Sequence, residues 1–204
     1  MDVAVALFRE SGFGGTNLNQ IVRKAHVTPG AFYYHFNSKE AVAFAIVDDV
    51  AARMADLRST YIGAPESGLG NVILMSFQLS ALLQKEPAFW AAAHLEHTMA
   101  RHSQRGIADM TDRIDEFVVA VRQAMPASQL REGVDPEHAA KTTVNLIYGS
   151  FMLSGLVEGG TVSRLAECWR ILLPGLVPPD LLPHFEKVVS DAVAHGRRPG
   201  IVDT

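Results

Sequence analysis

The sequence predicts an all-α protein with a small amino-terminal helical domain, residues 1–47, and a larger helical domain, residues 48–204. Apolar residues recur at intervals of three and four along almost the whole chain. Long β-branched runs with alternating polarity are missing, which argues against strands. The composition, 48% hydrophobic and 20% charged over 204 residues, is typical of a globular protein and not of a disordered one.

The first domain begins with two short apolar stripes at helical spacing. The first stripe lies in residues 4–8, and the helix that carries it is predicted to end at Gly12. The second lies in residues 18–25, with apolar side chains at i, i+3, i+4 and i+7, and Thr16 is suited to cap its N-terminus. These patterns predict one helix before Gly12 and a second one after Thr16.

The next helix is predicted to begin at Pro29 and to run to about Phe36. Thr28 suits the N-cap position, and proline suits the first helical position because its missing N–H is not needed there. Ser38 is predicted to cap a longer helix over residues 39–57.

Later helices are separated by residues that favour turns. The segment 63–68 contains two glycines and a proline and is predicted to be a connection. Further breaks are marked by glycine or proline pairs, including Gly159-Gly160. The spacing predicts helices at roughly 69–84, 87–102, 107–125, 136–157, 162–174 and 180–195.

Several classes of protein are excluded by composition. A single cysteine, Cys168, permits no internal disulfide and no cysteine-based zinc finger. The apolar residues 3–8 are too short and too acidic in their flank for a signal sequence. The apolar run between residues 141 and 158 is shorter than the ~20 residues that span a membrane. We therefore expect a cytoplasmic protein with no membrane partner.

The local charge of the first domain differs from that of the whole chain. The formal net charge is −4, yet the segment from Thr16 to Lys39 contains Arg23 and Lys24 and no aspartate or glutamate. Two short helices joined by a turn at residues 25–30 form a helix-turn-helix unit, whose second helix can lie in the DNA major groove. The charge pattern therefore predicts contact with phosphates.

The second helix of this unit carries three ringed side chains in succession. Phe32 and Phe36 share an inward face at i and i+4, which turns Ala31, Tyr33, Tyr34 and His35 wholly or partly outward. The phenols and the imidazole are suited to donate to phosphate oxygens, and Ala31 allows close approach to a thymine methyl. The alternative interpretation is a three-helix packing module with aromatic residues on its surface.

The segment TNLNQIVRKAHVTPGAFYYHFNSKE, residues 16–40, resembles the DNA-binding signature of TetR-type transcriptional regulators. The resemblance extends from residue 4 to about residue 47. It implies a dimeric repressor that binds a palindromic operator in double-stranded DNA through this domain. It also implies a helical ligand-binding domain and release from DNA when a small-molecule effector binds.

The resemblance assigns DNA contacts to individual residues. Thr16 is assigned to a phosphate at a helix start, and position 29 is proline where members of the family often have lysine or arginine. The basic segment that usually precedes the first helix is absent, so we expect lower non-specific affinity. The full set of expected DNA contacts is Thr16, Thr28, Gly30, Ala31, Tyr33, Tyr34, His35 and Lys39.

The carboxyl-terminal half carries a second resemblance. The segment RLAECWRILLPGLVP, residues 164–178, is similar to the closing segment of the γ-butyrolactone receptor branch of this family, and EPAFW, residues 86–90, fits the same branch. The effector implied is a γ-butyrolactone-like signal or another apolar small molecule. The tryptophan that lines the pocket in that branch should fall near Asp109 or Met110, and neither residue is aromatic.

Large apolar or polarizable side chains of the second domain could line a cavity between helices. Trp90 and Tyr148 are the better ligand candidates, because each has a hydrogen-bonding edge. The alternative is that these residues form ordinary core. The ligand-binding candidates are Phe77, Phe89, Trp90, His94, Phe117, Val121, Tyr148, Phe151 and Met152, with Met99 beside them.

The helices over 136–157 and 162–174 are apolar around their circumference, which predicts burial on all sides. A homodimer formed through residues about 136–174 would cover the surplus apolar face. The small residues Gly149, Ser150, Ser154 and Gly155 would allow the close approach of a partner helix.

Other functions were compared with DNA binding. His94, Glu96, His97 and His102 suggest metal sensing, but the cluster lacks a second pair of ligands at a known spacing. No nucleophile elbow, phosphate-binding glycine loop or metalloprotease motif is present, so no enzyme is expected. A helical scaffold that binds proteins remains a third possibility. We expect no cofactor and no metal site.

Overall fold

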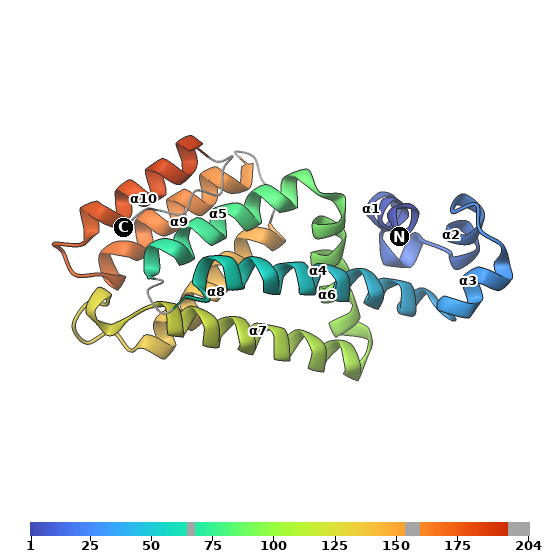
Figure 1. Cartoon of the computed structure of the whole chain (residues 1–204), viewed down its shortest axis with the longest axis horizontal. Helices are drawn as coiled ribbons and strands as arrows, with labels where there is room; N and C mark the ends of the chain where they lie inside the picture. Colours follow the sequence, from blue (N-terminus) through green and yellow to red (C-terminus); the bar gives the residue numbers. More distant parts are fainter. Residues whose placement is uncertain (65–67, 154–159, 196–204) are drawn as a thin grey trace. The chain divides into compact units, whose positions relative to one another are not determined.

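The computed structural model describes residues 1–64, 68–153 and 160–195. All regular structure within these ranges is helical (Figure 1). The helices are α1 (Asp2–Gly15), α2 (Leu18–Lys24), α3 (Pro29–His35), α4 (Lys39–Ile62), α5 (Leu69–Lys85), α6 (Pro87–His102), α7 (Gln104–Ala124), the 3-10 helix η1 (Ala127–Gln129), α8 (Pro136–Met152), α9 (Gly160–Leu176) and α10 (Leu182–His195). The all-α prediction is confirmed.

Most predicted helices appear at the expected places. The helix expected at 87–102 has those bounds, and the fourth helix continues five residues beyond its predicted end, to Ile62. The helix expected at 136–157 is described up to Met152, and residues 154–157, with the predicted contacts of Ser154 and Gly155, lie outside the described residues. The structure adds a short 3-10 helix, η1, which the sequence pattern did not indicate.

The chain divides into two compact units. Unit 1 comprises residues 1–54 and 83–112, and unit 2 comprises residues 55–82 and 113–204. This division differs from the boundary after residue 47, because α6 packs against α1 within unit 1. Residues that follow the first domain in sequence therefore contribute to the unit that holds it.

Unit 1 encloses a core drawn from α1, α2 and α4. Leu7 and Phe8 from α1, Ile21 from α2, and Val42 and Ile46 from α4 are buried. Phe32 is the buried residue of α3. Because these side chains recur at i, i+3 and i+4, one face of each short helix is committed to this core and the opposite face is left outside.

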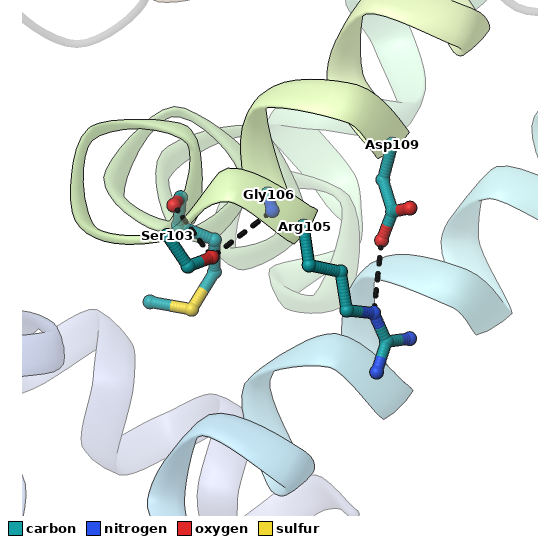
Figure 2. A network of polar contacts seen from close by, with 5 residues as sticks. Ser103, Arg105, Gly106 and Asp109 are labelled. Carbon is teal, nitrogen blue, oxygen red and sulfur yellow. Dashed lines mark hydrogen bonds and ion pairs between the residues drawn. The ribbon is translucent and has the colours of Figure 1, made fainter.

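Polar contacts stabilise the tight turn between α6 and α7 in unit 1 (Figure 2). The Ser103 hydroxyl donates to Met99 O and accepts from the Gly106 N–H at 3.0 Å. A Cβ on Gly106 would lie 2.3 Å from Met99 O, so only glycine allows this approach. Arg105 pairs with Asp109 at 3.2 Å, and its guanidinium lies 4.2 Å from the centroid of the Phe44 ring on α4.

Unit 2 is built around Trp169. This side chain is fully buried in α9, and its indole N–H donates to the Ser76 hydroxyl on α5 at 3.0 Å. The Ser76 hydroxyl in turn donates to Ile73 O. α9 packs against both α8 and α10, so it lies at the centre of this unit's helices.

The predicted end of the ninth helix at Pro174 is wrong, because α9 continues through this proline to Leu176. A proline inside a helix removes one backbone hydrogen bond and usually ends the helix. Arg131 supplies donors at the C-terminus of α9: its guanidinium donates to Pro174 O at 3.2 Å and its backbone N–H donates to Leu176 O at 2.9 Å. The last carbonyls of α9 are therefore satisfied from outside the helix.

No helix within the described residues is long and apolar enough to cross a membrane.

Candidate nucleic-acid interface

The helix α2 is capped by Asn17. The Asn17 side chain accepts a hydrogen bond from the backbone N–H of Asn19 at 2.8 Å and caps the first turn. The backbone N–H of Asn17 donates to the side-chain oxygen of Gln20 at 3.1 Å, which completes a capping box. The predicted cap, Thr16, is wrong in this respect. The Thr16 side chain instead turns inward, where it is 3% exposed.

The helix α3 begins as the sequence predicts. The Thr28 hydroxyl accepts from the Ala31 N–H at 3.3 Å, and Pro29 occupies the first turn. The helix contains seven residues and ends at His35. Phe32 is buried and its ring centroid lies 5.6 Å from that of Phe36, which confirms the inward face.

The opposite side of α3 is exposed. We call the exposed residues Thr28, Gly30, Ala31, Tyr33, Tyr34 and His35 the α3 face. Tyr34 exposes 85% of its surface and Tyr33 45%. A Cβ placed on Gly30 would meet open space, so a duplex backbone could approach this end of the face closely.

Tyr33 is held in place by α2. Its hydroxyl donates to the Asn19 side-chain oxygen at 3.1 Å, which joins α3 to α2. Tyr34 lies edge-on to His35, with ring centroids 5.1 Å apart. The sequence pattern singled out the rings but not Asn19, whose role depends on a contact between residues fourteen positions apart.

The turn between α2 and α3 contains a residue in the left-handed region. His26 has φ 54°, and it is the one non-glycine residue with positive φ among the described residues. Glycine is usual in this conformation because it has no Cβ. Composition did not reveal this position, because histidine at a turn has no strong sequence signature.

Thr16 and Lys39 lie at the base of the helix-turn-helix segment. The Thr16 hydroxyl donates to Gly12 O at 2.7 Å and to Leu7 O at 3.2 Å. The Lys39 ammonium donates to Phe13 O at 2.6 Å and to Thr16 O at 3.0 Å. Both side chains therefore contact the backbone of the protein, and their expected contacts with DNA stay predictions.

The electrostatics of the segment favour an anion. Glu10 and Glu40 are the nearest acidic residues on either side, and Arg23 and Lys24 are exposed at the end of α2. Uncompensated positive charge beside exposed hydroxyl and imidazole donors is the arrangement that binds a phosphate backbone. The geometry can therefore bind a nucleic acid through α3.

Comparison with known proteins agrees with this geometry. Residues 1–46 match the family model described as bacterial regulatory proteins, tetR family. Residues 1–46 therefore form a domain of the TetR amino-terminal type. The resemblance stated from residues 4–47 is thereby confirmed for this TetR-type domain.

One curated relative extends the similarity beyond the TetR-type domain, and another matches only a short segment. The A-factor receptor protein of Streptomyces griseus is 27% identical over 197 residues, which cover 91% of this chain and 65% of that protein. The biofilm operon negative transcriptional regulator IcaR of Staphylococcus aureus strain Newman is 38% identical over 42 residues, 21% of this chain and 23% of that protein. The chain thus spans less than two thirds of the length of these relatives.

Solved structures match almost the whole length of the chain. A crystal structure of a gamma-butyrolactone receptor, an ArpA-like protein, is 25% identical with a TM-score of 0.77 and covers 95% of this chain and 94% of its own. The TetR family protein CprB from Streptomyces coelicolor, in complex with its biological operator sequence, is 26% identical with a TM-score of 0.74, covering 95% and 94%.

The expected ligand-binding residues fall in both units, and each group is described within its own unit. Phe89, Trp90 and His94 belong to unit 1, whereas Phe77, Phe117, Val121, Tyr148, Phe151 and Met152 belong to unit 2. Phe77, Phe89, Val121 and Phe151 are buried, and the others are half-buried. Ligand binding by this set stays a prediction.

Within unit 1 the candidates form local packing contacts. The Trp90 and His94 rings stack at 3.9 Å between centroids, and the His94 ring nitrogen Nδ1 lies 2.9 Å from Trp90 O. The Phe89 ring lies under the guanidinium of Arg53, which also forms an ion pair with Glu86. Of these contacts, those of Arg53 join α4 to Phe89 on α6 and to Glu86 directly before it.

Among the described residues, no group of three or more histidine, cysteine, aspartate or glutamate side chains is placed to hold a metal ion. His102 instead places its ring nitrogen Nδ1 2.7 Å from Thr98 O, within its own helix.

Proposed function

We propose that this chain is a transcriptional repressor that binds a palindromic operator as a homodimer and is released by a small-molecule effector. One observation carries the proposal: the α3 face is exposed and free of acidic residues within a domain that matches the tetR family model. The structure of CprB with its operator supports the same mode of binding. Catalysis is not part of the proposal, since the similarity is to regulators and receptors.

DNA binding is tested by a gel shift with duplexes from the region upstream of the chain's own gene. Retardation of the upstream duplex at low salt that is stronger than that of a random-sequence duplex of equal length supports the proposal. The affinity should fall steeply with salt, because binding releases counterions from neutralised phosphates. Absence of any sequence-dependent retardation contradicts it.

The effector proposed is a γ-butyrolactone-like or other apolar molecule with at least one hydrogen-bonding group. Relatives described as gamma-butyrolactone receptors support the chemical class. The hydroxyls of Ser80 on α5 and Thr143 on α8 also support it, because they are buried without a hydrogen-bond partner among the described residues. An unpartnered buried hydroxyl costs about 1–3 kcal/mol, which a polar group of a ligand would recover.

Effector binding is tested by adding a panel of γ-butyrolactones to the protein–DNA complex. Release of the duplex at micromolar concentration supports the effector proposal. Thr143→Val keeps the shape and removes the hydroxyl, so it should weaken release and leave DNA binding unchanged. Asn145→Ala, a change at an exposed position of the same helix, serves as the control. Equal release from the wild type and from Thr143→Val contradicts a role for this hydroxyl.

The dimer proposed is formed through residues about 136–174. Ile171 on α9 exposes 84% of its surface, and Leu153, directly after α8, is also exposed. Both exposed side chains lie within the range proposed for the interface, where a partner chain would cover them. In a symmetric dimer, the two α3 faces would bind half-sites one helical turn apart, about 34–36 Å, or a multiple of it.

A further inference from the structure

Lys39 is the first residue of α4, and its side chain contacts the end of α1 and the residue that follows it. The ammonium donates to Phe13 O at 2.6 Å and to Thr16 O at 3.0 Å. It also lies 4.2 Å from the centroid of the Phe13 ring. Two hydrogen bonds and a cation–π contact therefore join one side chain to residues 13–16.

The carbonyls of this segment need partners from outside the helix. Helical conformation in α1 is interrupted at Gly12, which has φ 67° and ψ 177°. An interrupted helix end leaves carbonyl groups without their usual donors. The buried Thr16 hydroxyl shares its single proton between Gly12 O and the more distant Leu7 O. The Lys39 ammonium, which has several donors, bonds both Phe13 O and Thr16 O.

The bond from Lys39 to Thr16 also joins the two ends of the helix-turn-helix segment. Thr16 lies directly before the cap of α2, and Lys39 follows the Ser38 cap of α4, so α2 and α3 lie between them. The two residues are 23 positions apart. A contact that closes a segment of this length reduces the freedom of everything between its ends.

We infer that Lys39 is a positioning residue for DNA binding, which fixes the orientation of α3 relative to α1 and α4 and does not act by contact with a phosphate. This inference rests on the proposed function. It differs from the role that the family signature implies for this lysine, because both observed bonds of the ammonium go to carbonyl oxygens of the chain. The orientation of the α3 face is the property through which Lys39 acts on the operator.

Two substitutions separate the positioning role from a phosphate contact. Lys39→Arg keeps the charge, so a phosphate contact would survive, but the planar guanidinium does not fit between two converging carbonyls as a compact ammonium does. Lys39→Met keeps most of the stem and removes both donors. Lys24→Met, at an exposed lysine of α2, is the matched loss of charge away from these carbonyls.

The first measurement uses the full chain and a duplex that the wild type selects from a random-sequence library, compared with an unselected duplex. We expect both Lys39 variants to lose at least about tenfold in the ratio of selected to unselected affinity. The slope of log affinity against log salt should stay as in the wild type. A phosphate contact would instead reduce the slope of Lys39→Met by about 0.9 per protomer.

The second measurement is amide hydrogen exchange of the DNA-free protein. Residues 17–38 should exchange faster in both Lys39 variants, and α10 in unit 2 should be unchanged. Binding of Lys39→Arg equal to the wild type, a reduced salt slope in Lys39→Met, or unchanged exchange of residues 17–38 would each overturn the inference. If the wild type selects no duplex, the proposed function fails, and the exchange result alone decides whether Lys39 holds the segment.

Discussion

In the amino-terminal domain, the sequence pattern predicts the exposed position of Tyr34 but not the backbone conformation of His26. Tyr34 is exposed on α3 as its position in the sequence predicts, because the i, i+4 pair Phe32 and Phe36 takes the inward face. His26 adopts a left-handed conformation that no local pattern indicated. Local spacing determines which face a side chain occupies, whereas the backbone path of a turn depends on how the flanking helices pack.

Tyr34→Ala should weaken operator binding by about 1.5 kcal/mol, roughly tenfold, if its hydroxyl donates to a phosphate. Tyr34→Phe keeps the ring and separates the hydroxyl from the aromatic surface. The affinity is measured by fluorescence anisotropy of a labelled duplex, and light scattering should show an unchanged dimer. Unaltered affinity in Tyr34→Ala removes this residue from the interface.

His26→Gly should raise the free energy of unfolding by about 1 kcal/mol, because glycine tolerates positive φ without the Cβ contact that an L-residue makes. His26→Val should lower it, since a β-branched residue is strained in this region. Urea denaturation of both variants measures the difference. A less stable glycine variant would mean that the exposed imidazole contributes more than its backbone costs.

The spacing of apolar residues predicted the presence of the helices well and the residues at which they begin and end less well. Thr28 and Ser38 cap their helices as predicted, because a hydroxyl before a helix-forming run has one dominant use. The prediction of Thr16 as the cap was wrong because the next residue, Asn17, caps α2, and the Asn17 to Gln20 spacing of a capping box was a usable signal. The helix α9 continues two residues beyond Pro174, because a proline this close to a helix end removes only one hydrogen bond of the last turns.

Gly106→Ala tests the turn between α6 and α7. A Cβ there would lie 2.3 Å from Met99 O, so the substitution forces the backbone of α6 and α7 apart and should cost about 1–3 kcal/mol. Gly70→Ala is the control, because a Cβ at that position inside α5, outside the proposed dimer interface, would meet open space. That substitution should stabilise the protein by about 0.5–1 kcal/mol. Thermal unfolding of the two variants should therefore shift in opposite directions.

The boundary after residue 47 lies at the end of the TetR-type signature, and the packed unit that contains this signature also includes residues 48–54 and 83–112. α6 lies far along the chain and packs on α1, and periodicity carries no information about such long-range pairs. The expected ligand set was chosen by side-chain type, so it spans both units. Composition predicted the class of protein, and tertiary packing decided which residues share a unit.

Ile171→Glu should convert a dimer into a monomer, because it places a charge on an apolar side chain that is 84% exposed in the single chain. Light scattering at micromolar concentration gives the mass. Ile107→Glu, an equally polar change at an exposed position on α7 in unit 1, is the control and should leave the dimer intact. A wild type that is already monomeric, or a dimeric Ile171→Glu, contradicts the proposed interface.

The two tryptophans of the sequence are divided between the units: Trp90, half-buried and stacked on His94, in unit 1 and Trp169, buried against Ser76, in unit 2. Each unit therefore carries its own intrinsic fluorophore. In Trp90→Phe all indole emission comes from unit 2, and in Trp169→Phe it comes from unit 1. The pair would tell an experimenter which half of the protein responds first to heat, denaturant or a bound molecule, without any external label.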